Sequence, residues 1–175
     1  MQLGPLGWFA AMLGNTYSGQ VCSAARALEV IGERWTILIV RDAFLGVRRF
    51  DDFQRSLGIA RNVLQGRLER LVENGILERV RYQERPERFE YRLTEKGLDL
   101  WPVVVSLLAW GDRHMAPDGP PVVLEHRGCG GRVNDRRICE ACGALLGPRD
   151  ASARRGPALA DAAADAVQPA LASRG

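Results

Sequence analysis

The chain has 175 residues, of which 46% are hydrophobic and 26% are charged. This balance is ordinary for a protein with a buried core, and it excludes a wholly disordered, collagen-like or membrane-spanning chain. No run approaches the roughly 20 apolar residues that a bilayer-crossing helix needs. Residues 1–25 carry no charge and so lack the basic region of a secretion signal. We therefore expect a cytoplasmic protein that does not bind membranes.

The formal net charge is +3, which is only weak support for a polyanionic partner. Lys96 is the only lysine, so nearly all of the basic residues are arginine. A GC-rich genome explains that bias without any function. Arginine nevertheless suits contacts with phosphate and guanine, because its planar guanidinium group binds both through two hydrogen bonds.

Composition divides the chain into five zones. Residues 1–21 form a glycine-rich leader, of which residues 1–11 lie outside the product if Met12 is the true start. Periodic apolar positions fill residues 22–115. Prolines mark a linker at 116–121, and a short Cys/His segment covers 122–148. Residues 149–175 hold no aromatic side chain, so we expect them to form a disordered tail.

Apolar residues recur at helical spacing in four segments before residue 75. The first predicted helix ends at Gly32, the second covers 35–45, a short third covers 51–57 and the fourth covers 60–74. A glycine follows each predicted end, which is the usual signal for a helix C-terminus.

The next segment predicts a hairpin and then a long helix. Residues 76–82 and 88–93 are rich in β-branched and aromatic residues, and the polar residues 83–87 join them. Thr94 is a good N-cap for the last helix, and Pro102 is expected to kink or break it. The fold class is thus mainly α with a small β-hairpin, in the order of a winged helix-turn-helix, followed by a small metal-binding segment and the tail.

The fourth predicted helix fits the part of a recognition helix. If Leu64 lies at the centre of its buried face, the exposed side and the first turn carry Arg61, Asn62, Gln65, Gly66 and Glu69. Arginine, asparagine and glutamine read base edges in the major groove, and Gly66 leaves room for the duplex. A plain amphipathic helix with a solvated face shows the same pattern. Arg85 and Arg88 in the hairpin loop favour DNA binding, although Glu84 and Glu87 flank them.

Residues 22–113 closely resemble the HxlR-type winged-helix transcription regulators, which are relatives of the MarR group. Each matching piece is short, but the ordered set is specific and covers a little over half of the chain. The matching features are Cys22, Ile31-Gly32-Glu33-Arg34-Trp35, Gly46-Val47-Arg48-Arg49-Phe50-Asp51-Asp52-Phe53, Gly58-Ile59-Ala60-Arg61-Asn62-Val63-Leu64, Leu68-Glu69-Arg70-Leu71, Tyr82, Pro86, Glu90-Tyr91-Arg92-Leu93-Thr94-Glu95-Lys96-Gly97 and Trp110.

The resemblance implies a homodimer on double-stranded DNA with a palindromic operator, its first and last helices forming the subunit interface. It also implies control of adjacent genes in response to a small molecule or an oxidant. The DNA-binding positions that it implies are Arg49, Arg61, Asn62, Gln65, Arg85 and Arg88. The apolar stripe Leu98, Trp101, Val105 and Leu108 on the last helix is expected to bury against the partner, or in part against the chain's own core.

Cys22 has two interpretations. Near a helix start its thiolate is favoured by the helix dipole, and some members of the family sense oxidants with a cysteine at this position. The alternative is a small residue packed in the dimer core, and we favour it because no second cysteine lies in residues 23–115.

The Cys/His segment predicts a metal site. His126 and Cys129 form one pair, and Cys139 and Cys142 form a second pair with the same spacing. Three thiolates and one imidazole are a typical tetrahedral set for structural Zn²⁺, so we expect a zinc-ribbon-like segment. A redox-active dithiol, bound iron and an empty site are the alternatives.

The leading hypothesis is therefore a regulator that is not an enzyme, because no catalytic triad and no phosphate-binding glycine loop is present. A thiol-based redox protein is the second hypothesis. A winged helix used only for protein docking is the third.

Overall fold

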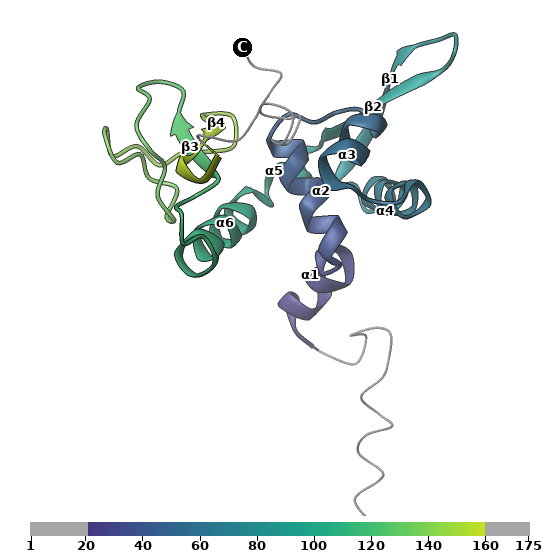
Figure 1. Ribbon diagram of the computed structural model, residues 1–175. Helices are drawn as coiled ribbons and strands as arrows, with labels where there is room; N and C mark the ends of the chain where they lie inside the picture. Colours follow the sequence, from purple (N-terminus) through teal and green to yellow (C-terminus); the bar gives the residue numbers. More distant parts are fainter. Residues whose placement is uncertain (1–20, 160–175) are drawn as a thin grey trace, which may run out of the picture.

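The computed structural model of the chain describes residues 21–159, which leaves the predicted leader outside the described residues except for Val21 (Figure 1). The elements are α1 Ser23–Ile31, α2 Arg34–Phe44, α3 Phe50–Leu57, α4 Arg61–Glu73, β1 Leu77–Gln83, β2 Arg88–Leu93, α5 Glu95–Leu98, α6 Trp101–Met115, β3 Val122–His126 and β4 Ala151–Arg155, followed by a 3₁₀ turn at Pro157–Leu159. The strands form two antiparallel pairs, β1 with β2 and β3 with β4. The predicted class, mainly α with a hairpin in winged helix-turn-helix order, is confirmed.

A tight turn orients α4 against α3. Gly58 closes α3 in a left-handed conformation, with φ of 61°, and its amide donates to the Gln54 carbonyl. The chain then reverses, so that α3 and α4 pack on α2. Leu64, Leu68 and Leu71 of α4 are completely buried there. The predicted leucine face is therefore the inner face of this helix.

The hairpin of β1 and β2 follows α4 directly and projects from the body as the wing (Figure 1). Thr94 fixes its base, because its hydroxyl accepts from the Gly97 amide at 3.1 Å and donates to the Gly75 carbonyl at 2.6 Å. A Cβ on Gly97 would lie 2.2 Å from the Ile76 carbonyl oxygen, so only glycine fits at this contact. The predicted N-cap role of Thr94 is confirmed.

Pro102 lies in the first turn of α6, where a helix needs no amide donor. The long helix predicted from Thr94 is accordingly broken into α5 and α6. Within the described residues, no helix is both long enough and apolar enough to cross a bilayer.

The C-terminal segment docks on α6. Trp101 and Val105 of α6 form a buried apolar cluster whose remaining members are Val133, Cys139, Leu146 and Ala151. Trp101 and Val105 thus bury against the chain's own core, which is the second of the two outcomes expected for this stripe, and they do not face a partner subunit. A second stripe of α6, at Val103, Leu107, Trp110 and Met115, is exposed instead.

The predicted boundary at residue 148 is also wrong. Ala151–Arg155 form β4, which pairs with β3 from Val122↔Arg155 to His126↔Ala151. The sequence of β4 has no aromatic or β-branched residue, so its composition indicated disorder. Pairing with the edge of β3 supplies the backbone hydrogen bonds that make it a strand. The rest of the predicted tail, residues 160–175, lies outside the described residues.

We expect Leu68→Ala to lower the free energy of unfolding by about 2–5 kcal/mol, because it empties a fully buried site between α4 and α2. Urea denaturation followed by circular dichroism measures the change. Gln65→Ala, on the exposed face of the same helix, serves as the control and should stay within about 0.5 kcal/mol of the wild type. Equal effects of the two substitutions would contradict the assignment of faces.

Candidate functional site

The outer face of α4 is polar and accessible. Arg61, Asn62 and Gln65 are all exposed, as predicted from the position of Leu64. The Asn62 side chain has no hydrogen-bond partner within residues 21–159, whereas the Gln65 side-chain amide donates to Glu69 at 3.0 Å. This face therefore presents donors and acceptors that a ligand can reach.

Arg61 is held at the start of α4 by two contacts. Its guanidinium carbon lies 4.6 Å from the centre of the Phe50 ring, and its Nη1 lies 3.4 Å from an Asp51 oxygen. Both charged side chains are mostly exposed, so this ion pair is weak and an anion can replace Asp51. The ring contact leaves the guanidinium beside the exposed face of the helix.

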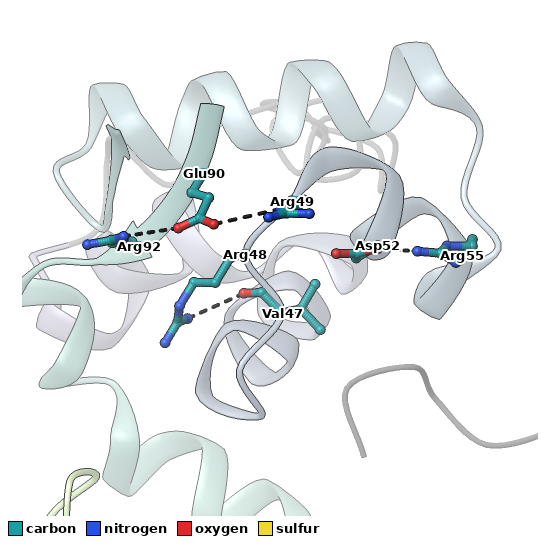
Figure 2. A network of polar contacts seen from close by, with 7 residues as sticks. All are labelled: Val47, Arg48, Arg49, Asp52, Arg55, Glu90 and Arg92. Carbon is teal, nitrogen blue, oxygen red and sulfur yellow. Dashed lines mark hydrogen bonds and ion pairs between the residues drawn. The ribbon is translucent and has the colours of Figure 1, made fainter. Parts of the chain in front are cut away.

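Arg49 connects the helices to the wing. Its Nε lies 3.7 Å from a Glu90 oxygen, and Glu90 also accepts from Arg92 at 3.0 Å (Figure 2). The Arg49 guanidinium stacks on the Tyr82 ring at 4.6 Å. The Tyr91 amide donates to the Arg48 carbonyl, so the segment before α3 is bonded to β2. Arg49 thus lies between α3 and the wing.

In the wing, the acidic side chains of the loop pair with an arginine of β1 and not with the two predicted arginines. Arg81 of β1 lies 3.9 Å from a Glu84 oxygen and 3.4 Å from a Glu87 oxygen. Arg85 and Arg88 are exposed, and neither side chain has a partner in the described part of the chain. The two acidic residues are therefore matched by Arg81, and the two predicted arginines stay available.

The sequence analysis missed Arg79. It lines a hollow between α4 and the wing together with Arg61, Gln65 and Tyr91. Its guanidinium stacks on the Phe89 ring at 3.5 Å. The signal was available, because Arg79 and Arg81 share one face of β1 and alternate along the strand with Val80 and Tyr82.

The predicted metal ligands come together. One donor atom each from His126, Cys129, Cys139 and Cys142 lie within 4.8 Å of one another, so the cluster can hold a metal ion. His126 Nδ1 lies 3.3 Å from the sulfur of Cys129 and 3.3 Å from that of Cys142. Zn–S bonds of about 2.3 Å in a tetrahedral site place two sulfurs about 3.8 Å apart. The 3.5 Å between the sulfurs of Cys129 and Cys139 fits that geometry.

The loops around the cluster leave space for sulfur. A Cβ on Gly131 would lie 2.5 Å from the sulfur of Cys139, so this position requires glycine. The backbone amides of Cys142 and Ala141 lower the pKa of Cys139 to about 6. Cys139 is therefore ready to act as the thiolate that a metal ion needs.

Cys22 is exposed and is the N-cap residue of α1. The amides of Ala25 and Ala24 lower the pKa of its thiol. It lies outside the Cys/His cluster. Burial of Cys22 would require a partner subunit or residues beyond the described range.

The comparisons with known proteins identify the family. The profile of the HxlR-like helix-turn-helix family matches residues 30–119, which is half of the chain. The chain belongs to the HxlR-like helix-turn-helix family. The predicted resemblance to the HxlR-type winged-helix regulators is confirmed.

One relative of this HxlR-like protein is the HTH-type transcriptional regulator Rv3095 of Mycobacterium tuberculosis, which is 48% identical over 146 residues. The alignment covers 83% of this chain and 91% of Rv3095. An alignment that covers 83% of this chain is longer than residues 1–119, so it continues into the C-terminal segment. YodB of Bacillus subtilis is 34% identical to this chain. That alignment covers 60% of this chain and 92% of YodB.

Solved structures agree with this HxlR-like fold. PA1607, a candidate transcription factor, superposes with a TM-score of 0.61 at 44% identity, over 74% of this chain and 92% of its own. The redox regulator HypR in its reduced form superposes with a TM-score of 0.52 at 31% identity. The superposition covers 54% of this chain and 95% of HypR. The winged-helix part is therefore shared with both proteins.

We expect thiol titration to separate the four cysteines of the Zn²⁺-loaded protein. Only exposed Cys22 should react fast, because bound thiolates are protected, and all four should react fast after a chelator is added. In Gly131→Ala, where the new methyl group collides with Cys139, all four should react fast before chelation. A control, Gly66→Ala, meets only open space and should behave like the wild type. Fast reaction of all four thiols in the loaded wild type would disprove a metal site.

Proposed function

We propose that this HxlR-like protein is a dimeric, sequence-specific DNA-binding regulator of adjacent genes in the cytoplasm, with no catalytic step. The observation that carries the proposal is the face of α4. Its leucines are buried, and Arg61, Asn62 and Gln65 are exposed on the side opposite the core. A helix in this arrangement after a tight turn, with a wing beside it, suits the major groove.

Each residue predicted to contact DNA has a specific role in this proposal. Asn62 and Gln65 read base edges, and Arg61 reads guanine or binds phosphate at the start of the helix. Arg85 and Arg88 bind the backbone beside the wing, where their charges are not matched by Glu84 or Glu87. Arg49 binds phosphate at the junction of α3 and the wing.

The proposed dimer uses α1 and α6. On α6, Leu107, Trp110 and Met115 are 50%, 53% and 70% exposed, and Leu28 of α1 is 49% exposed. Large apolar side chains that remain in water along helix faces favour association with a second apolar surface. Two copies joined this way present two α4 helices, which suits a palindromic operator.

We further propose that the bound metal ion is structural Zn²⁺. Three sulfurs and one imidazole nitrogen form a closed ligand set with no position left for a substrate. Metal binding would stabilise the packing of the C-terminal segment on α6, because Cys139 belongs to both the metal cluster and the apolar cluster.

Thiol-based redox control is a second candidate, and the exposure and lowered pKa of Cys22 favour it. HypR, to which this chain is similar, is described as a redox regulator. Packing of Cys22 in the dimer remains our first interpretation, because Cys22 has no neighbouring cysteine among the described residues. A use of the winged helix for protein docking alone would leave the polar face of α4 unexplained.

We expect Arg61→Ala and Gln65→Ala each to weaken specific DNA binding by about 1–3 kcal/mol while leaving the fold intact. Fluorescence anisotropy with the DNA upstream of the protein's own gene measures the loss. Arg136→Ala, an exposed arginine of the C-terminal segment, is the matched control and should bind like the wild type. Unchanged operator discrimination by Gln65→Ala, or wild-type binding that does not weaken as salt rises, would refute the proposal.

We expect Trp110→Glu to convert the dimer to a monomer, because the new carboxylate would be buried in an apolar interface. Multi-angle light scattering gives the mass of each species. Gln54→Glu on α3 adds the same charge away from α1 and α6 and should remain dimeric. A wild-type protein with the mass of one chain would rule out the proposed interface.

A further inference from the structure

A cavity of about 390 Å³ lies between α2, α6 and the β3–β4 hairpin. Its apolar wall includes Phe44 of α2, Trp101 and Leu108 of α6, and Leu124 of β3. The rings of Phe44 and Trp101 are tilted against each other, with centres 5.3 Å apart. Cavities of this size with aromatic walls are typical of sites for small organic molecules.

The polar part of the wall is positive. Arg41, Arg127, Arg154 and Arg155 line the cavity, and no acidic side chain lines it among the described residues. Arg41 is paired with buried Asp42, and Arg154 with Glu125. Arg127 is exposed, and its side chain makes no hydrogen bond or ion pair within the described residues. The cavity therefore attracts an anion, and Arg127 is available to bind it.

Trp101 lines the cavity with its ring and not with its indole N–H. It is only 4% exposed, and its Nε1 is buried without a hydrogen-bond partner in the described structure. Because that nitrogen has almost no accessible surface, a molecule in the cavity meets the ring of Trp101 and does not reach its N–H. The available polar partner in the wall is Arg127, whose guanidinium group suits a carboxylate.

We propose that this cavity binds a small aromatic carboxylate. The ring would pack against Phe44, Trp101 and Leu108, and the carboxylate would meet Arg127. Ser152 of β4 also lines the cavity and supplies a hydroxyl. The site needs the C-terminal segment, because β3 and β4 supply one of its walls.

The position of the cavity gives the ligand a route to DNA binding, and this step rests on the proposed function. Arg41 and Phe44 belong to α2, whose buried Ile39 and Val40 share one core with Leu64 and Leu68 of α4. A ligand that is held between α2 and the C-terminal segment changes the packing of the helix against which α4 rests. The carboxylate would then act as an effector that changes operator affinity.

Isothermal titration calorimetry of the full-length, Zn²⁺-loaded protein tests the cavity without DNA. The probe is 1-naphthoate, and 1-naphthalenemethanol is its uncharged match. We expect 1-naphthoate to bind at least tenfold more tightly than the alcohol. Failure of 1-naphthoate to bind at millimolar concentration, or equal binding of the two compounds, would overturn the proposal.

Two variants test the named contacts. Arg127→Ala removes an exposed, unpaired side chain and should weaken 1-naphthoate binding at least fivefold, whereas Arg136→Ala should have no effect. Trp101→Leu removes the aromatic ring from the cavity wall, so it should also weaken binding. Circular dichroism checks that this variant folds; if it does not, Arg127→Ala alone decides. Wild-type affinity in Arg127→Ala would overturn the assigned site.

Anisotropy with the upstream DNA tests the regulatory step separately. Saturating 1-naphthoate should change the affinity of the wild type at least threefold and leave that of Arg127→Ala unchanged. No change in the wild type would overturn the effector role while calorimetry still supports the cavity. If the wild type shows no specific DNA binding in the absence of 1-naphthoate, the proposed function is refuted, but the ligand site is not.

Discussion

The burial of the leucine face of α4 is the constraint on which the other features depend. Leu64, Leu68 and Leu71 have no exposed surface, and they pack in the core that also contains Ile39 and Val40 of α2. Since a helix that is anchored along one stripe cannot rotate, the opposite stripe must face solvent. The positions of Arg61, Asn62 and Gln65, and of the wing that follows, are consequences of that anchoring.

Sequence reasoning succeeded where one residue carries a local signal. Gly58 gave the turn before α4, Thr94 gave the N-cap of α5, and Pro102 gave the break between α5 and α6. The four metal-binding residues were found because the two pairs have equal spacing. Each of these features depends on residues that are close together in the chain or on a ligand type with few alternatives.

Sequence reasoning failed where the outcome depends on distant residues. Helix α6 is apolar on more than one side, and periodicity alone does not tell which side packs on the chain itself. Strand β4 has a poor strand sequence and exists because β3 offers it an edge. The cavity could not be predicted, because Phe44, Trp101 and Arg154 meet there from three separate parts of the chain.

Cys139 contributes to two parts of the structure at once. Its sulfur belongs to the His/Cys cluster, and its buried side chain belongs to the apolar cluster around Trp101. By thermodynamic linkage, binding of a metal ion to that sulfur, or its oxidation, alters the environment of the Trp101 indole ring in α6. Trp101, one of the four tryptophans, is thus placed so that its share of the intrinsic fluorescence responds to the chemical state of the thiol.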